Sequence, residues 1–269
     1  MNDLLEQIQA YKTQEVQNIR RDFDEALLKA AAFSVGGEFR SLELDIRNAA
    51  SFPVLVELKS ILFPAMVELE DFQPLRAVKA LLEAGLEGGV IIASDSYFLG
   101  GDPSWINLIK HSTPLAVIQR DFFIDPAQFY QGKAIGADGY LIHAGIAGAE
   151  RLPGLLEAAS EMGLEVYLEL DRPELAETID PATLTGLVVN LPADPAELTG
   201  DAISAFQRAT EGIKLRLARC LPRNAADVQR LAALNFQGII LNDDFWQQPS
   251  FVEHFKTVRE WCEAVFRKQ

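Results

Sequence analysis

Charged and amide side chains recur at regular places along this sequence, each directly after a short apolar run. They include acids, bases and cations, the residue types that transfer protons or hold anions. Gathered around one cavity sheltered from water, such groups could combine a general acid, a general base and an anion clamp. The residues are Glu57, Lys59, Ser94, Asp95, Arg120, Asp121, His143, Glu169, Asp171, Asn190, Arg219, Cys220, Asn242, Asp243 and Asp244.

Several of these residues also have a purely structural interpretation. Glu57 and Lys59 lie two positions apart and point the same way on a strand, so they could form an ion pair and nothing more. A histidine at the position of His143 is more often part of a cavity wall than a catalyst. Asp243 and Asp244 could cap a short helix that follows them.

Eight short runs rich in Val, Ile and Leu are expected to be the strands that position these groups. Segments 75–88 and 151–165, which lie between such runs, have helical periodicity and end near a glycine. Apolar strands that alternate with helices indicate a parallel sheet covered by helices. Eight repeats in about 220 residues predict a (β/α)8 TIM barrel, an α/β fold whose C-terminal strand ends share one mouth. The runs are 54–58, 89–94, 115–119, 139–143, 164–170, 186–190, 214–218 and 237–242.

The whole chain, residues 1–269, is expected to form one TIM-barrel domain. Residues 1–50 are interpreted as an N-terminal helical extension and residues 51–269 as the barrel. An open, doubly wound sheet is the alternative. However, no Gly-x-Gly-x-x-Gly follows any of the strands, so the dinucleotide-binding form of that fold would lack its phosphate-binding turn.

Composition narrows the possible classes of function. The 269 residues are 49% hydrophobic, enough for a sizeable core, and carry a net charge of -15. Such a surface repels nucleic acid and anionic lipid, so neither is expected as a partner. The two cysteines form no Cys-x-x-Cys pair, and we expect neither a metal site nor a disulfide. The charged N-terminus and the lack of an apolar run of about 18 residues predict a cytoplasmic protein without a membrane segment.

Five segments give the sequence a family resemblance. They are "LLEQIQAYKTQEV" from residue 4, "VELK" from 56, "SDSYFLGG" from 94, "RDFFIDPAQFYQGKAIGAD" from 120 and "YLELD" from 167. The last four resemble the patterns A-E-I-K, T-D-x-x-F-F-x-G, K-D-F-I-I-D-x-Y-Q-I-Y-E-A-x-x-x-G-A-D and L-V-E-V-H of the indole-3-glycerol phosphate synthase family. This resemblance implies a carboxy-lyase of tryptophan biosynthesis. In its reaction 1-(2-carboxyphenylamino)-1-deoxyribulose 5-phosphate closes onto its own carbonyl, loses carbon dioxide and dehydrates, without metal or cofactor.

The resemblance also implies roles for individual residues. Glu169 resembles the family's general base, and Arg120 stands where the family has the lysine that acts as general acid. A guanidinium, with a pKa above about 12, gives up a proton far less readily than an ammonium group does. The positions that match the family's site are Glu57, Lys59, Phe98, Glu169 and Asn190.

The family's phosphate-binding segments are altered in this sequence. Leu-Phe-Pro at 62–64 replaces Ser-Pro-Ser, and Arg-Cys-Leu-Pro at 219–222 replaces Glu-Ser-Gly-Ile, so a glycine that lets backbone N–H groups approach an anion is lost. Asn-Asp-Asp at 242–244 replaces Gly-x-Ser, and Pro192 replaces an arginine. Two carboxylates facing a phosphate dianion would repel it.

Three hypotheses of function follow. The chain is a divergent paralogue, a pseudoenzyme that has lost the parent activity and binds another small ligand, or a protein partner, at the mouth. Alternatively, it is an active indole-3-glycerol phosphate synthase, with Arg120 as electrostatic stabiliser, Lys59 as acid and Arg219 holding the phosphate. The third hypothesis is new chemistry on a non-phosphorylated or cationic substrate.

Arg219 offers a geometric test of the first hypothesis. It lies at the end of the seventh strand, beside the eighth, so we expect it to form an ion pair with Asp243 or Asp244 across the old phosphate site. The other residues expected to contact a ligand are Phe98, His143 and Asn242.

Overall fold

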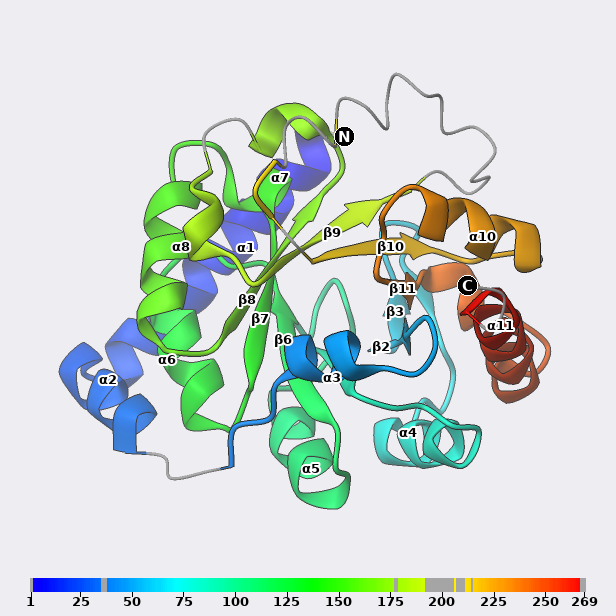
Figure 1. Ribbon diagram of the computed structural model, residues 1–269. Helices are drawn as coiled ribbons and strands as arrows, with labels where there is room; N and C mark the ends of the chain where they lie inside the picture. Colours follow the sequence, from blue (N-terminus) through cyan, green and yellow to red (C-terminus); the bar gives the residue numbers. More distant parts are fainter. Residues whose placement is uncertain are drawn as a thin grey trace.

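In the part of the chain that the structure describes, parallel β-strands close into a barrel of eight (Figure 1). The computed structural model describes residues 2–34, 38–176, 179–191, 206, 211–213 and 215–266. The first strand has two parts, β1 (Val54–Leu55) and β2 (Glu57–Leu58). β1 pairs with β11 (Gly238–Leu241) and β2 pairs with β5 (Gly89–Ala93), so this one segment closes the barrel. The predicted TIM barrel is confirmed.

The remaining barrel strands follow the predicted runs to within two residues at either end. Two of them continue further than predicted, because polar residues at their ends still pair with a neighbouring strand. Arg120 and Asp121 are in register with Leu141 and Ile142, and Cys220 is in register with Leu241. These strands are β6 (Ala116–Asp121), β7 (Gly139–His143), β8 (Glu165–Leu170), β9 (Gly186–Asn190) and β10 (Arg216–Cys220).

Helices cover the outside of the barrel. The two predicted helices, α4 (Pro74–Glu83) and α8 (Leu152–Glu161), end earlier than expected, because Gly85 (φ 95°) and Gly163 (φ 66°) adopt the left-handed conformation that stops a helix. A short hairpin of β3 (Ile61–Leu62) and β4 (Val67–Glu68) follows β2. The other covering helices are α5 (Ser104–Ser112), α6 (Ala127–Ala134), α7 (Ala144–Ala147), α10 (Ala225–Ala233) and α11 (Phe251–Phe266).

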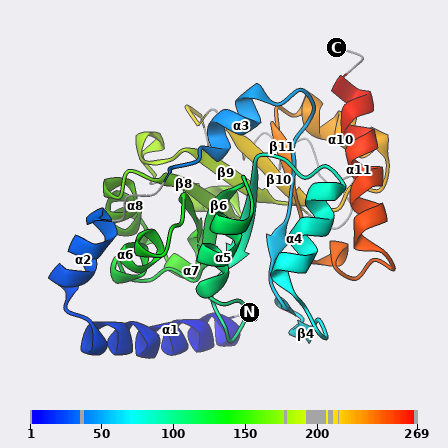
Figure 2. The ribbon, with the colours of Figure 1, turned by 90° about the horizontal axis from the view of Figure 1, so that it is seen from below.

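The N-terminal extension supplies helices to both ends of the barrel, as Figure 2 shows. Helix α3 (Leu42–Asn48) closes the N-terminal end, where Leu42 and Ile46 join the apolar cluster inside the barrel. Helix α1 (Asn2–Asp22) lies at the opposite end, and α2 (Glu25–Ser34) packs against α6. Among the helices of the described ranges, none has the length and low charge that a membrane-spanning segment requires.

Candidate active site

The polar residues at the strand ends lie inside the barrel, directly above its apolar layer. Side chains alternate between the two faces of a strand. Ile118, Leu141, Tyr167 and Leu217 belong to the inner apolar cluster, so the residue two positions further along each strand also points inwards. These inner positions are Arg120 on β6, His143 on β7, Glu169 on β8 and Arg219 on β10. Glu57 on β2 is in register with Ile91 of the same apolar cluster, and Asn190 on β9 is in register with Arg219, so both also point inwards.

Four of these side chains form a closed ring of alternating charge. Nη1 of Arg219 donates to Oε2 of Glu57 at 2.6 Å, and its Nε lies 2.9 Å from Oε1 of Glu169. On the other side, Nε of Arg120 lies 3.3 Å from Oε1 of Glu57, and its Nη1 donates to Oε2 of Glu169. All four side chains are buried. We call these four residues, Glu57, Arg120, Glu169 and Arg219, the ion ring.

The ion ring holds its members in their charged forms. Burial by itself raises the pKa of Glu169, but Arg120 and Arg219 more than offset this effect and lower that pKa to about 2. Glu57 behaves in the same way: burial opposes ionisation, and the neighbouring cations lower its pKa to about 2. Burial also disfavours the charged form of Arg120, yet the two glutamates hold its pKa well above the usual range. At neutral pH the carboxylates of the ring are therefore very weak proton acceptors.

Lys59 extends the ion ring towards the eighth strand. Its Nζ lies 3.5 Å from Oε1 of Glu57 and also pairs with Oδ1 of Asp243. The predicted ion pair between Arg219 and Asp243 or Asp244 is therefore wrong. Arg219 forms ion pairs with Glu57 and Glu169 inside the barrel, whereas Asp243 forms an ion pair with the ammonium group of Lys59.

The segment after β11 is a capped turn. Asn242 accepts a hydrogen bond from the backbone N–H of Asp244 at 3.2 Å and so caps the 3-10 helix Asp243–Phe245. Asp244 is exposed and its carboxylate contacts only Asn242 and Gln247, both at 3.5 Å, among the described residues. Of the three residues predicted here, only Asp243 has an ion pair in the mouth.

His143 and Asn190 share the carboxylate of Asp171, which is one of the polar residues that follow the apolar runs but is not one of those to which the sequence assigned a catalytic or ligand-binding role. Nε2 of His143 lies 3.1 Å from Oδ2 of Asp171, and Asn190 donates from Nδ2 to Oδ1 of the same carboxylate at 2.6 Å. Burial raises the pKa of Asp171, but the hydrogen bonds from His143 and Asn190, together with nearby positive charge, lower it to about 2. His143 is also in register with Glu169, so this trio borders the ion ring.

Phe98, which is predicted to contact a ligand, lies in a buried aromatic group beneath α1. Its ring meets those of Tyr11 and Phe122 edge-on, with centroids 5.7 and 5.9 Å apart. Sequence reasoning missed α1 as a contributor to this end of the barrel. Lys12, on that helix, pairs with strand-end carboxylates. One sequence pattern could have revealed this. Lys12 is four residues from Ile8 and four from Val16, both apolar, so the three side chains share one face of a helix and that face is expected to be buried.

Charged side chains that converge at the C-terminal strand ends of a parallel barrel are what TIM-barrel proteins use to build active sites. The family model for indole-3-glycerol phosphate synthase matches residues 5–187 of this chain. The chain therefore belongs to the indole-3-glycerol phosphate synthase family.

Curated relatives carry the name indole-3-glycerol phosphate synthase. One from Rhodopirellula baltica is 28% identical over 199 residues, covering 73% of this chain and 76% of the relative. Another, from Albidiferax ferrireducens, is 26% identical over 257 residues, covering 93% and 95% of the two chains.

Solved structures with little sequence identity share the fold. A 3-hexulose-6-phosphate synthase from Salmonella typhimurium has a TM-score of 0.57 at 14% identity, covering 79% of this chain and 99% of the other. An orotidine 5'-phosphate decarboxylase from Pyrococcus horikoshii has a TM-score of 0.53 at 14% identity, covering 77% and 98%. These likenesses support the barrel alone.

Proposed function

We propose that this family member no longer closes the indole ring and that its mouth binds a small ligand without a phosphate group. The observation that carries the proposal is the ion ring. Glu169, which resembles the family's general base, forms ion pairs with Arg120 and Arg219. Arg120, which replaces the general acid, forms ion pairs with Glu169 and Glu57. The two groups expected to transfer protons, Glu169 and Arg120, thus neutralise each other in an ion pair.

Acid–base chemistry at this ring is poorly matched to neutral pH. An efficient general base has a pKa near the working pH, whereas the pKa of Glu169 is about 2. Arg120 cannot donate a proton at any ordinary pH. The general base and the general acid of the parent mechanism are therefore both weakened. The two changes are linked, because Glu169 and Arg120 are partners in the ion ring.

The charge of the mouth also argues against a phosphate dianion. Among the described residues of the mouth, four carboxylates face three cations. The carboxylates belong to Glu57, Glu169, Asp171 and Asp243 and the cations to Lys59, Arg120 and Arg219. A phosphate placed beside Asp243 would be repelled by about 1–4 kcal/mol per close charge pair.

The altered phosphate-binding segments support the same proposal. Leu62 and Leu221 have no polar side-chain atom to offer an anion. Leu62 is buried in the β3–β4 hairpin, and Leu221 packs against the apolar cluster between the strands and the covering helices. Pro192, the fourth of these changes, lies outside the described residues. The match to the family model ends at residue 187, before β10 and β11 begin.

An uncharged polar ligand suits two buried polar atoms of the mouth that have no hydrogen-bond partner among the described residues. Nη2 of Arg219 and Oδ1 of Asn190 are buried without a hydrogen-bond partner among the described residues, and the two residues are in register on β10 and β9. One is a donor and the other an acceptor. A hydroxyl or carboxamide group, which has both functions, could bind to the pair after a small side-chain movement.

The parent reaction is the second candidate, because the relatives are named for it and Lys59 is retained. An ammonium group, unlike a guanidinium, can serve as a general acid. In this chain, however, Lys59 is held between Glu57 and Asp243.

The two candidates differ in a direct assay. Purified protein is incubated with 1-(2-carboxyphenylamino)-1-deoxyribulose 5-phosphate, and indole fluorescence is followed. We expect no turnover near the rate of about 1 per second that is usual for enzymes. Indole formation at that rate would reject the proposal and establish the parent reaction.

Calorimetric titration with inorganic phosphate tests the charge argument separately. Wild type is expected to bind no phosphate in the millimolar range. Asp243→Gly should free the Lys59 ammonium and permit weak binding, whereas Asp244→Ser, which alters an exposed carboxylate outside the ion pairs, should behave as wild type. Tight phosphate binding by wild type would contradict the proposed ligand class.

A further inference from the structure

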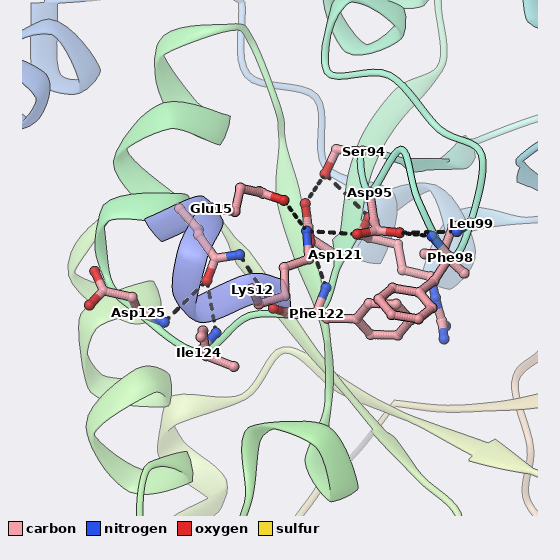
Figure 3. Close-up of polar contacts among 12 residues, drawn as sticks. Lys12, Glu15, Ser94, Asp95, Phe98, Leu99, Asp121, Phe122, Ile124 and Asp125 are labelled. Atoms are coloured by element: carbon pink, nitrogen blue, oxygen red, sulfur yellow. Dashed lines mark hydrogen bonds and ion pairs between the residues drawn. The ribbon is translucent and has the colours of Figure 1, made fainter. Parts of the chain in front are cut away.

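Lys12 is a fully buried cation at the end of the barrel where the mouth lies, and it comes from outside the barrel. Its side chain is 0% exposed. Nζ lies 2.9 Å from Oδ2 of Asp95, 2.5 Å from Oδ1 of Asp121 and 3.0 Å from Oε2 of Glu15 (Figure 3). Asp95 follows β5 and Asp121 ends β6, so one side chain on α1 joins two neighbouring strands.

The two aspartates that bind Lys12 also shape the backbone around them. Oδ1 of Asp95 accepts hydrogen bonds from the N–H groups of Phe98 and Leu99, at 2.6 and 3.0 Å, and so folds the loop after β5. Asp121 accepts from the backbone N–H of Phe122 at 2.7 Å and from Oγ of Ser94 at 2.6 Å. The position of Lys12 is therefore transmitted to the loop after β5 and to the last residues of β6.

Charge makes this arrangement depend on the ammonium group. One cation faces three carboxylates, and two of these, on Asp95 and Asp121, have nearly fully buried side chains. Burial disfavours a charged lysine, yet the carboxylates hold the pKa of Lys12 well above its usual range. Burial and the charge of Asp121 raise the pKa of Glu15. Without Lys12, two buried carboxylates would lie close together with no neutralising charge from α1.

Among the described residues, other polar contacts between α1 and the rest of the chain are longer or more exposed. Nε2 of Gln9 donates to the carbonyl oxygen of Ile146 at 3.3 Å, and Arg20 pairs with Asp125 at 3.0 Å near the surface. Tyr11 stacks on Tyr97 with centroids 4.9 Å apart. Within the described part of the chain, Lys12 is thus a fully buried polar contact between α1 and the strand ends.

A covalent or acid–base role for Lys12 does not fit this environment. A lysine that attacks a carbonyl must be deprotonated and reachable by substrate. Lys12 is enclosed by carboxylates that keep it protonated, and its side chain is covered on every side.

We propose that Lys12 is a positioning residue that makes helix α1 part of the mouth. Its ammonium group holds Asp95 and Asp121, and through them it sets the backbone that carries Arg120 of the ion ring. The proposal does not depend on which ligand the mouth takes, since it concerns the geometry of the ligand-free chain.

The experiment compares full-length wild type with Lys12→Met, a substitution that retains an unbranched apolar stem and removes the terminal ammonium group with its charge. Amide hydrogen exchange reports on α1, with α11 on the outside of the barrel as an internal reference for global opening. Nitrogen-15 NMR of the guanidinium Nε–H of Arg120 reports on the ion ring. Gln9→Ala, which removes a weaker polar contact between α1 and the barrel, is the matched control.

Exchange in α1 is expected to rise at least about 100-fold in Lys12→Met, because a buried ion pair that loses one partner leaves an uncompensated charge. Exchange in α11 should rise far less, and the Arg120 resonance should shift. Gln9→Ala should produce only a small rise in α1 and no shift at Arg120. If Lys12→Met does not fold, Asp95→Asn, which keeps an oxygen for the loop N–H groups, should show the same changes at smaller size.

Two results would overturn the proposal. Unchanged exchange in α1 would mean that apolar packing alone holds the helix. Faster exchange in α1 with an unmoved Arg120 resonance would mean that Lys12 fastens the helix but positions nothing in the mouth.

Discussion

Replacing Glu57 with glutamine removes the carboxylate that contacts both arginines of the ion ring and Lys59. The pKa of Glu57 is about 2 in the folded protein, against an ordinary value of 4.5. Because the folded-state pKa is the lower one, ionisation of Glu57 stabilises the fold fully above pH 4.5, and this stabilisation disappears as pH falls towards 2. The shift corresponds to about 3 kcal/mol at pH 7 and to less than half of that at pH 3.

Urea unfolding of wild type and Glu57→Gln at pH 7, 5, 4 and 3 measures this difference. At pH 7 the variant should lose about 3 kcal/mol of unfolding free energy, or roughly 5 °C of melting temperature for a chain of this size. The loss should at least halve by pH 3. Glu253→Gln is the control, because Glu253 forms an exposed pair with Lys256 and should cost little at any pH. An equal cost of Glu57→Gln at pH 7 and pH 3 would refute the assigned pKa and the ion ring as its cause.

Three further substitutions test packing and buried polar contacts elsewhere in the barrel, and urea unfolding measures the cost of each. Gly101→Ala should destabilise by about 1–3 kcal/mol or more, because the added Cβ would lie 2.1 Å from the carbonyl oxygen of Ala93; a neutral result would show that the loop after β5 adjusts freely. Lys110→Met leaves the buried carboxylate of Asp138 without its cationic partner and should lower the free energy of unfolding by about 3 kcal/mol, without moving the Arg120 NMR signal. Tyr140→Phe removes a hydrogen bond of 2.7 Å to a carbonyl oxygen of α6 and should cost about 1–2 kcal/mol; a loss below 0.5 kcal/mol, roughly the error of such measurements, would contradict that estimate.

The barrel and its inward-facing residues could be predicted because both follow from local patterns. Each apolar run marks a buried strand, and the two-residue repeat decides which side chains face inwards. Their positions at the strand ends predicted that Glu57, Arg120, His143, Glu169, Asn190 and Arg219 share one barrel mouth, and the strand register places all six on the inner face of the barrel.

The partners of these residues could not be predicted, because they depend on distances across the barrel rather than along the chain. Arg219 lies beside the eighth strand, but its guanidinium reaches Glu57 and Glu169 instead of Asp243. The capping alternative was closer to the structure, with Asn242 as the cap. Lys12 was missed for a related reason, since a lysine amid apolar residues reveals its buried partners only when the helix is docked.

The contacts of Lys12 also set an order of events in folding. Helix α1 is the first described element of the chain, yet the carboxylates that receive its buried lysine follow β5 and end β6. Contacts between residues so far apart in sequence form late, because the intervening chain must first be brought together. During synthesis, α1 therefore cannot reach its final place until residue 121 has been made and both strands have joined the sheet. Until then, its apolar face and its lysine remain open to water and to other proteins.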